Sequence, residues 1–163
     1  MTTKPRVALI GTGGTISSIG RDSLDLWEYM DSSRKAEPDE LLARFPEVPA
    51  AAEIVPVRFR AVGSTSIGPA EWLALNAAVH DAATREAPLD GVVITHGTAT
   101  LEETAYFLNL TLATDATVVV VGAQRPATGL SSDAGLNLLN AVRVAAAPEA
   151  RDLGVLAVSE ARR

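Results

Sequence analysis

Short apolar runs alternate with longer amphipathic segments along this chain. Residues 7–10, 92–95 and 117–121 are almost uniformly apolar, and strands without polar alternation are typical of a parallel sheet covered on both faces. Residues 154–158 form a further apolar run and predict a last strand. Residues 53–62 alternate only in part, and Pro56 within them favours an edge or irregular position. We therefore predict strands over these five segments.

Amphipathic segments between these runs predict helices. They cover residues 38–45, with Pro38 near the first position, residues 69–85, a segment that opens at Thr100, and residues 131–146. The TLEE sequence at 100–103 predicts a capping box, and the SSD sequence at 131–133 predicts a helix cap. The faces expected to point inward are Trp72, Leu75, Val79 and Ala82 on the second helix, Leu101, Ala105, Leu108 and Leu112 on the third, and Leu136, Leu139 and Val142 on the fourth.

The order of strand, helix and strand predicts an α/β fold with a mainly parallel sheet between two helical layers. We expect this three-layer α/β/α arrangement, similar to flavodoxin or Rossmann-type domains, as a single domain over residues 1–163. Residues 16–19 and 23–27 flank a Gly-Arg-Asp turn and predict a β-hairpin after the first strand. Residues 29–35 show no clear period and predict a loop.

Composition narrows the classes of function. The chain has 163 residues and a net charge of −6, which does not favour nucleic-acid binding. It has no cysteine and two histidines, which excludes thiol chemistry and disfavours a site of several histidines around a metal. No apolar run is long enough for a signal peptide or a membrane span. We therefore expect a cytoplasmic protein without a metal, a cofactor, a nucleic-acid partner or a membrane partner.

Polar residues follow three of the predicted strands. These stretches are GTGGT at 11–15, THGT at 95–98 and GAQRP at 122–126. Carboxyl ends of parallel strands meet at one edge of a sheet, where α/β folds bind ligands. The first stretch is a tight structural turn, a source of a catalytic or ligand-binding hydroxyl, or a phosphate cradle. It lacks the Lys-Ser/Thr pair of a P-loop and the third glycine of a dinucleotide motif.

The other polar positions also leave two interpretations open. Thr98 is either a turn residue or part of a site, and His96 is either structural or a general base. Arg125 either binds a carboxylate or forms a structural ion pair. Ser64, after the strand at 53–62, either bonds to its own backbone or contacts a ligand. Free amides at the start of the helix after Thr98 favour an anion or an oxyanion nearby.

Taken together, these stretches resemble the L-asparaginase family of bacterial type, which includes asparaginases and glutaminases. The similar stretches are TGGTI at 12–16, GS at 63–64, THGT at 95–98, EETAYF at 102–107, VGAQRP at 121–126, SSDAGLNLLNAV at 131–142 and GVLAV at 154–158. They follow the family's order and roughly its spacing over nearly the whole chain. The resemblance implies a hydrolase that converts a side-chain amide to a carboxylate and ammonia without a metal.

The resemblance also implies roles for individual residues. Thr15 matches the family's nucleophilic threonine, Thr98 matches its second catalytic threonine, and Tyr29 is the counterpart of a loop tyrosine that assists the nucleophile. Ser64 matches a serine that binds the α-carboxylate of the substrate, and Thr65 beside it is a further candidate for binding. Ala123 matches a residue whose backbone carbonyl contacts the substrate amide.

Two departures from the family's pattern change the expectation. Ala99 stands where the family usually has an aspartate that holds the α-ammonium of the substrate, so an amide without that amine is conceivable. No lysine follows Lys35, whereas the family has a catalytic lysine after its last matching strand and then a C-terminal domain.

These departures imply an N-terminal domain alone, with weak or no activity by itself. The family's active enzymes are tetramers, which implies a homo-oligomer or association with a full-length homologue. The alternative functions are a truncated, catalytically impaired member that acts as a binding or assembly module, and a nucleotide-binding module that uses the glycine turn.

Overall fold

A five-stranded parallel sheet forms the centre of the molecule. The computed structural model describes residues 4–32, 34–84 and 87–159. Across the sheet, the strand order is β4-β1-β5-β6-β7, and every neighbouring pair is parallel. The strands are β1 (Arg6–Gly13), β4 (Glu53–Val62), β5 (Gly91–Thr95), β6 (Thr117–Val121) and β7 (Val155–Val158). All five predicted strands are confirmed, and β4 lies at an edge, as Pro56 indicated.

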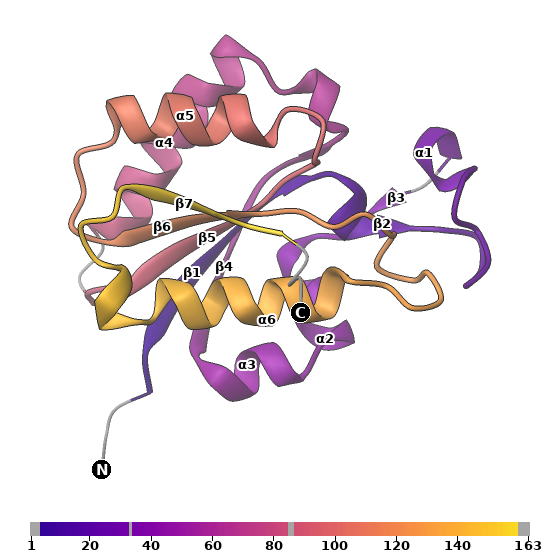
Figure 1. Ribbon diagram of the computed structural model, residues 1–163, viewed down its shortest axis with the longest axis horizontal. Coiled ribbons are helices and arrows are strands. Elements are labelled where there is room, and N and C mark those ends of the chain that lie inside the picture. The colour runs from indigo at the N-terminus through magenta and orange to yellow at the C-terminus, as the bar shows by residue number, and fades with distance from the viewer. Residues whose placement is uncertain (1–3, 33, 85–86, 160–163) are drawn as a thin grey trace.

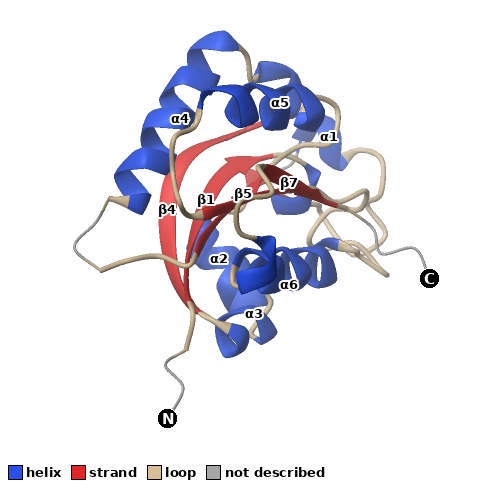
Figure 2. Ribbon diagram, turned by 60° about the vertical axis from the view of Figure 1, so that its left-hand side comes forward, coloured by secondary structure: helices blue, strands red, loops and turns tan. Residues whose placement is uncertain are grey.

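Helices cover both faces of the sheet (Figures 1 and 2). The helices α4 (Pro69–Ala83) and α5 (Leu101–Thr111) lie on one face. The opposite face carries α2 (Pro38–Arg44), α3 (Glu47–Ala51) and α6 (Ala134–Ala145). Short 3₁₀ segments are η1 (Thr15–Ser17), η2 (Ser64–Ser66) and η3 (Pro148–Ala150). The predicted three-layer α/β/α fold is therefore confirmed, and α3 is an addition to the predicted helices.

Alternate residues of each strand supply two separate cores. On β1, Val7 and Leu9 belong to the cluster packed against α2, α3 and α6, whereas Ala8 and Ile10 belong to the cluster packed against α4 and α5. All four side chains are completely buried. Burial on both faces explains the uniformly apolar runs in the sequence.

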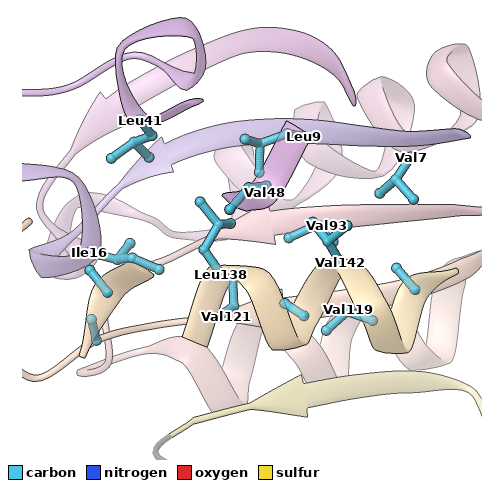
Figure 3. Packing of buried hydrophobic residues seen from close by; sticks show 14 of the residues in the cluster. Val7, Leu9, Ile16, Leu41, Val48, Val93, Val119, Val121, Leu138 and Val142 are labelled. Carbon is cyan, nitrogen blue, oxygen red and sulfur yellow. The ribbon is translucent and has the colours of Figure 1, made fainter. Parts of the chain in front are cut away.

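The helix α6 packs on β5 and β6 through a regular apolar face. Figure 3 shows Leu138 and Val142 of this helix beside Val93 and Val121 of the sheet. The inward face predicted for this helix is partly wrong, because Leu136 is 57% exposed and Leu138 is buried. Both leucines fit a helical period, and local spacing alone could not decide which of them faces the sheet.

The segment after β1 differs from the predicted hairpin. A two-stranded antiparallel sheet does form, but β2 (Ser18–Ile19) pairs with β3 (Arg34–Lys35) and not with residues 23–27. The predicted loop at 29–35 is wrong, because it contains α1 (Tyr29–Ser32) as well as β3. The pairing joins residues far apart in the chain, which the local pattern does not reveal. No helix among the described residues is long and apolar enough to cross a membrane.

Candidate functional site

A cavity of about 390 Å³ opens at the carboxyl end of the sheet. It is lined by Gly14, Thr15, Tyr29, Met30, Lys35, Gly63, Ser64, Thr65, Thr98, Ala99 and Gln124. The structure thus brings together six of the residues singled out from the sequence, which are Thr15, Tyr29, Ser64, Thr65, Thr98 and Ala99. Ala123 lies outside this cavity, in the neighbouring turn. The roles of these residues stay predictions.

Two glycines allow the turns that carry the threonines to touch each other. Gly14 has φ 78° and ψ −178°, a conformation that is essentially restricted to glycine. A Cβ on Gly14 would overlap the backbone of Gly97, and a Cβ on Gly97 would lie 2.5 Å from the Cβ of Ser64. The turns after β1, β4 and β5 therefore meet backbone to backbone, which places Thr15 and Ser64 around one space.

Thr15 is held on a rigid turn with Tyr29 beside it. The Gly14 carbonyl accepts hydrogen bonds from the Ser17 and Ser18 hydroxyls, each at 3.1 Å. The hydroxyls of Thr15 and Tyr29 lie 3.5 Å apart, and either one can be the donor. Tyr29 is only 6% exposed. The turn therefore presents the Thr15 hydroxyl to the cavity with one phenol as its close polar neighbour.

Asp25 fixes the position of Tyr29. Its Oδ1 accepts the Tyr29 amide at 2.8 Å, and its Oδ2 accepts the Arg21 amide at 3.0 Å. The hydrogen bond from Arg21 is the main reason that the pKa of Asp25 is lowered, with the Tyr29 amide adding to it. An ionised carboxylate at this position anchors the start of α1, where the sequence predicted a loop.

The capping box predicted at the start of α5 is wrong. Thr100 is the residue before the helix, but its side chain makes no capping hydrogen bond. Its hydroxyl instead donates to the Ser64 carbonyl at 2.8 Å. The Thr100 side chain thus bonds to a neighbouring loop and does not cap its own helix. The bond ties the turn of Thr98 to the turn of Ser64.

Asp133 orders the turn that contains Ala123 and Gln124. Its carboxylate accepts the amides of Gln124 and Arg125, each at 2.9 Å, and the side-chain amide of Asn137 at 3.0 Å. Asp133 precedes α6, as predicted, but its side chain makes no capping bond to that helix.

A second cavity of about 220 Å³ lies beside the turn of Ala123 and Gln124. It is lined by Thr98, Gly122, Ala123, Gln124, Asp133, Asn137 and Ser159.

His96 is a structural residue in this fold. It is completely buried, and it does not line the cavity of Thr15. Its Nδ1 lies 2.8 Å from the Gly97 carbonyl, and its Nε2 lies 2.9 Å from the Thr104 hydroxyl. Because a carbonyl only accepts, Nδ1 carries the proton, and Nε2 accepts from Thr104. Thr104 in turn accepts from the Trp72 indole at 2.9 Å. This chain of bonds holds the turn before Thr98.

We expect His96 to make the protein less stable in mild acid. Burial lowers the pKa of His96 below its ordinary 6.5, so the unfolded chain binds this proton more readily than the folded chain. The free energy of unfolding should therefore fall as the pH drops below about 6.5, and the His96 contribution should level off below the folded-state pKa. Urea unfolding at a series of pH values measures this slope.

The variant that tests this prediction is His96→Gln. It should flatten the pH slope relative to the unmodified chain, even though it lowers stability overall. Equal slopes for His96→Gln and the unmodified chain would contradict the assignment.

Two other sequence candidates lie apart from the cavity of Thr15. Among the described residues Arg125 forms no ion pair, and its guanidinium donates to the Ser131 carbonyl at 3.0 Å. Thr12 is 1% exposed and donates to the Thr95 carbonyl at 2.7 Å, which makes it a brace between β1 and β5. Within the described ranges, no group of three or more His, Cys, Asp or Glu side chains is placed to hold a metal ion.

The sequence pattern missed two polar residues of the cavity, Lys35 and Gln124. The Lys35 ammonium donates to the Ser18 hydroxyl at 2.8 Å, and burial lowers the pKa of Lys35. Lys35 reaches the cavity through the pairing of β2 with β3. Gln124 belongs to a stretch that the sequence did single out, but only Ala123 and Arg125 were considered there.

Comparisons with known proteins agree with this arrangement. The family model "Asparaginase, N-terminal" matches residues 6–162. The chain is 42% identical over 153 residues to a glutaminase-asparaginase from Acinetobacter glutaminasificans, covering 94% of this chain and 45% of that protein. It is 41% identical over 155 residues to a probable periplasmic L-asparaginase from Haemophilus influenzae, covering 93% and 42% of the two chains.

A solved structure shares the fold. The crystal structure of a probable cytoplasmic L-asparaginase from Campylobacter jejuni superposes with a TM-score of 0.85 at 37% identity, covering 95% of this chain and 46% of that one. The chain thus spans less than half the length of the relatives that it matches. The match over residues 6–162 and the identity near 40% leave one assignment: the chain belongs to the asparaginase family and corresponds to its N-terminal domain.

Proposed function

We propose that this chain carries the nucleophile and part of the substrate site of an amidohydrolase. The reaction is hydrolysis of the side-chain amide of L-asparagine, or of a related small amide, to the acid and ammonia. The observation that carries the proposal is the cavity in which Thr15, Tyr29 and Thr98 gather, with the hydroxyls of Thr15 and Tyr29 3.5 Å apart. Relatives named as asparaginases and glutaminase-asparaginases support it.

Thr15 acts as the nucleophile in this scheme. A threonine hydroxyl is weakly nucleophilic and needs a neighbouring group to accept its proton, and Tyr29 is placed to relay it. The Thr15 oxygen attacks the amide carbon, the carbon–nitrogen bond breaks, and the nitrogen leaves as ammonia with the relayed proton. Water then hydrolyses the ester on Thr15, releases the acid and restores the hydroxyl. The sum is amide plus water to acid plus ammonia.

The other residues of the site bind and orient the substrate. Thr98 faces the same cavity and also lines the second one, so its hydroxyl is suited to position the amide or the water. Ser64 and Thr65 offer hydroxyls to a carboxylate of the substrate. The Ala123 carbonyl is a candidate acceptor for the amide nitrogen, and Ala99 contributes a small apolar wall.

Tyr29→Phe is expected to reduce kcat by about a hundredfold, because proton relay contributes at least that much in comparable sites. The change removes only the hydroxyl beside Thr15, so the KM should change little. Steady-state kinetics of ammonia release measures both. Tyr106→Phe is the matched control, since Tyr106 is 67% exposed on α5. A Tyr29→Phe enzyme with unaltered kcat would remove the relay from the scheme.

The proposed function is tested by ammonia release from L-asparagine and L-glutamine. The assay uses the protein with this sequence. Mass spectrometry of the acid-quenched reaction should find the acyl group as an ester on the peptide that contains Thr15. A folded protein that releases no ammonia from these or other small amides would favour the binding-module alternative.

Location and assembly also belong to this proposal. We propose a cytoplasmic protein. The Campylobacter jejuni relative, described as a probable cytoplasmic enzyme, supports this location, whereas the Haemophilus influenzae relative, described as periplasmic, does not. We also propose a homo-oligomer. Cell fractionation with an antibody to the chain and light scattering of the purified protein test the two statements separately.

A further inference from the structure

The turn after β6 is held from one side by two residues at the start of α6. The carboxylate of Asp133 accepts the backbone amides of Gln124 and Arg125, each at 2.9 Å. The side-chain nitrogen of Asn137 donates to the Gly122 carbonyl and to the Asp133 carboxylate, each at 3.0 Å. Asn137 is 2% exposed, so both of its donors are satisfied inside the protein. Three of these bonds end on peptide groups that follow one another in the turn.

The bonds to Asp133 determine where the opposite sides of these peptide groups point. No peptide bond among the described residues is cis, and the N–H and C=O of a trans peptide point in opposite directions. The Gln124 amide points at Asp133, so the Ala123 carbonyl of the same peptide group points away from it. Ala123 lines the second cavity, and Gln124 lines both this cavity and that of Thr15. This peptide group therefore lies at the boundary between the two cavities.

Gly122 carries the effect of Asn137 to Thr98. A Cβ placed on Gly122 would lie 2.8 Å from the Cγ2 of Thr98, so the methyl group of Thr98 packs against the Gly122 backbone. The methyl and the hydroxyl of a threonine share one carbon atom, and contact with the methyl restricts the direction of the hydroxyl. Because Asn137 holds the Gly122 carbonyl, it also limits the positions that the Thr98 hydroxyl can take beside the cavity of Thr15.

We propose that Asn137 and Asp133 are positioning residues that make the site selective for amides over esters. They fix the turn so that the Ala123 carbonyl accepts an N–H of the substrate's amide group. A carbonyl is only an acceptor, so it can bind a leaving nitrogen that carries hydrogen atoms, whereas the leaving oxygen of an ester offers it no donor. The inference rests on the proposed function, because it concerns the amide group that Thr15 attacks.

The effect is expected in the step that breaks the carbon–nitrogen bond. The leaving nitrogen takes up the relayed proton and gains positive charge, so its hydrogen bond to the Ala123 carbonyl becomes stronger as the reaction proceeds. An interaction that is stronger in the transition state than in the bound substrate accelerates the reaction itself. A small displacement of the carbonyl, after the loss of Asn137 or Asp133, should therefore slow the release of ammonia.

The test compares L-asparagine with the β-methyl ester of L-aspartate. Attack by Thr15 on either substrate gives the same ester on the enzyme, so the two reactions differ only in the group that leaves, which is ammonia or methanol. Release of each product gives kcat/KM, which covers the steps up to the departure of that group. Asn137→Leu should lower the amide-to-ester ratio of kcat/KM at least about tenfold, as expected for the loss of one hydrogen bond to a charged group.

Asp133→Asn tests the same turn without changing a fully buried residue. Asp133 is half-buried, and a carboxamide has nearly the same shape as a carboxylate, but its single oxygen cannot replace the two oxygens that accept the three N–H groups. The amide-to-ester ratio should again fall at least about tenfold. Asn140→Leu is the matched control and should keep the ratio, because Asn140 lies on the same helix and lines neither cavity.

The ratio separates positioning from a merely structural role. Urea unfolding identifies the variants that are folded, and Asp133→Asn decides alone if Asn137→Leu does not fold. An unchanged ratio in the folded variants, with both activities kept or both lowered equally, would overturn the inference and leave the proposed function standing. If the unmodified protein hydrolyses neither substrate and forms no ester on Thr15, the proposed function is wrong and the inference falls with it.

Discussion

Thr15→Ala is expected to abolish amide hydrolysis, with a loss of about 10⁴-fold or more in kcat. The variant removes the atom that attacks the amide and leaves the cavity otherwise intact. The free energy of unfolding should change little, because Thr15 is partly exposed and its closest side-chain bond is the 3.5 Å contact with Tyr29. Ammonia release gives the activity, and urea unfolding gives the stability.

Thr12→Val is the matched control for this prediction. Thr12 lies three positions earlier, near the end of β1, and its hydroxyl links β1 to β5 by donating to the Thr95 carbonyl. Its loss should cost about 1 kcal/mol of stability while the folded protein keeps its turnover. Residual activity above about 1% in Thr15→Ala, measured on protein free of wild-type contamination, would exclude Thr15 as the nucleophile.

Gly14→Ala is expected to have the largest effect on stability, about 2–6 kcal/mol. Backbone strain contributes about 1–3 kcal/mol, because an alanine rarely adopts the conformation of Gly14. Overpacking adds about 1–3 kcal/mol, because the new Cβ would overlap the backbone of Gly97. This is a large part of the total stability of a domain of this size. Denaturant unfolding of the variant measures the loss.

Gly63→Ala provides the comparison for stability. Gly63 lines the same cavity, but it has φ −70° and ψ 151°, and no heavy atom lies within 4 Å of a Cβ placed on it. Alanine at this position should stabilise the protein by about 0.4–1 kcal/mol, because it reduces the conformational freedom of the unfolded chain. A similar loss of stability in both variants would show that the contact between the turns of Gly14 and Gly97 is not the cause.

The strands could be predicted from the sequence because burial on both faces of the sheet leaves a continuous apolar run in the local sequence. Val92 and Val120 are apolar for the same reason, since both faces of a parallel strand are covered. The predictions that failed share one cause, which is contact between segments that are distant in the sequence. Lys35 reaches the cavity only because β3 pairs with β2, and the Thr100 hydroxyl turns to the Ser64 carbonyl instead of its own helix. Neither contact leaves a trace in the local pattern.

The candidate site was largely predictable for a topological reason. Thr15, Ser64 and Thr98 follow strands that lie side by side, so a parallel sheet brings them to the same edge. The sequence left the role of His96 open, because a histidine after a buried strand can be either a structural residue or a general base. Its hydrogen bonds to Gly97 and Thr104 decide in favour of structure.

The two edges of the sheet differ in their capacity for aggregation. On β4, Pro56 has no amide hydrogen to offer an incoming strand, and Arg58 and Arg60 carry charges that ion pairs with Asp39 and Glu71 hold in place. Prolines and charges of this kind discourage sheets of different molecules from joining. The edge strand β7 consists of Val155, Leu156, Ala157 and Val158. Amyloid-like association of partly unfolded molecules should therefore begin at β7, and a lysine in place of Ala157 should delay it.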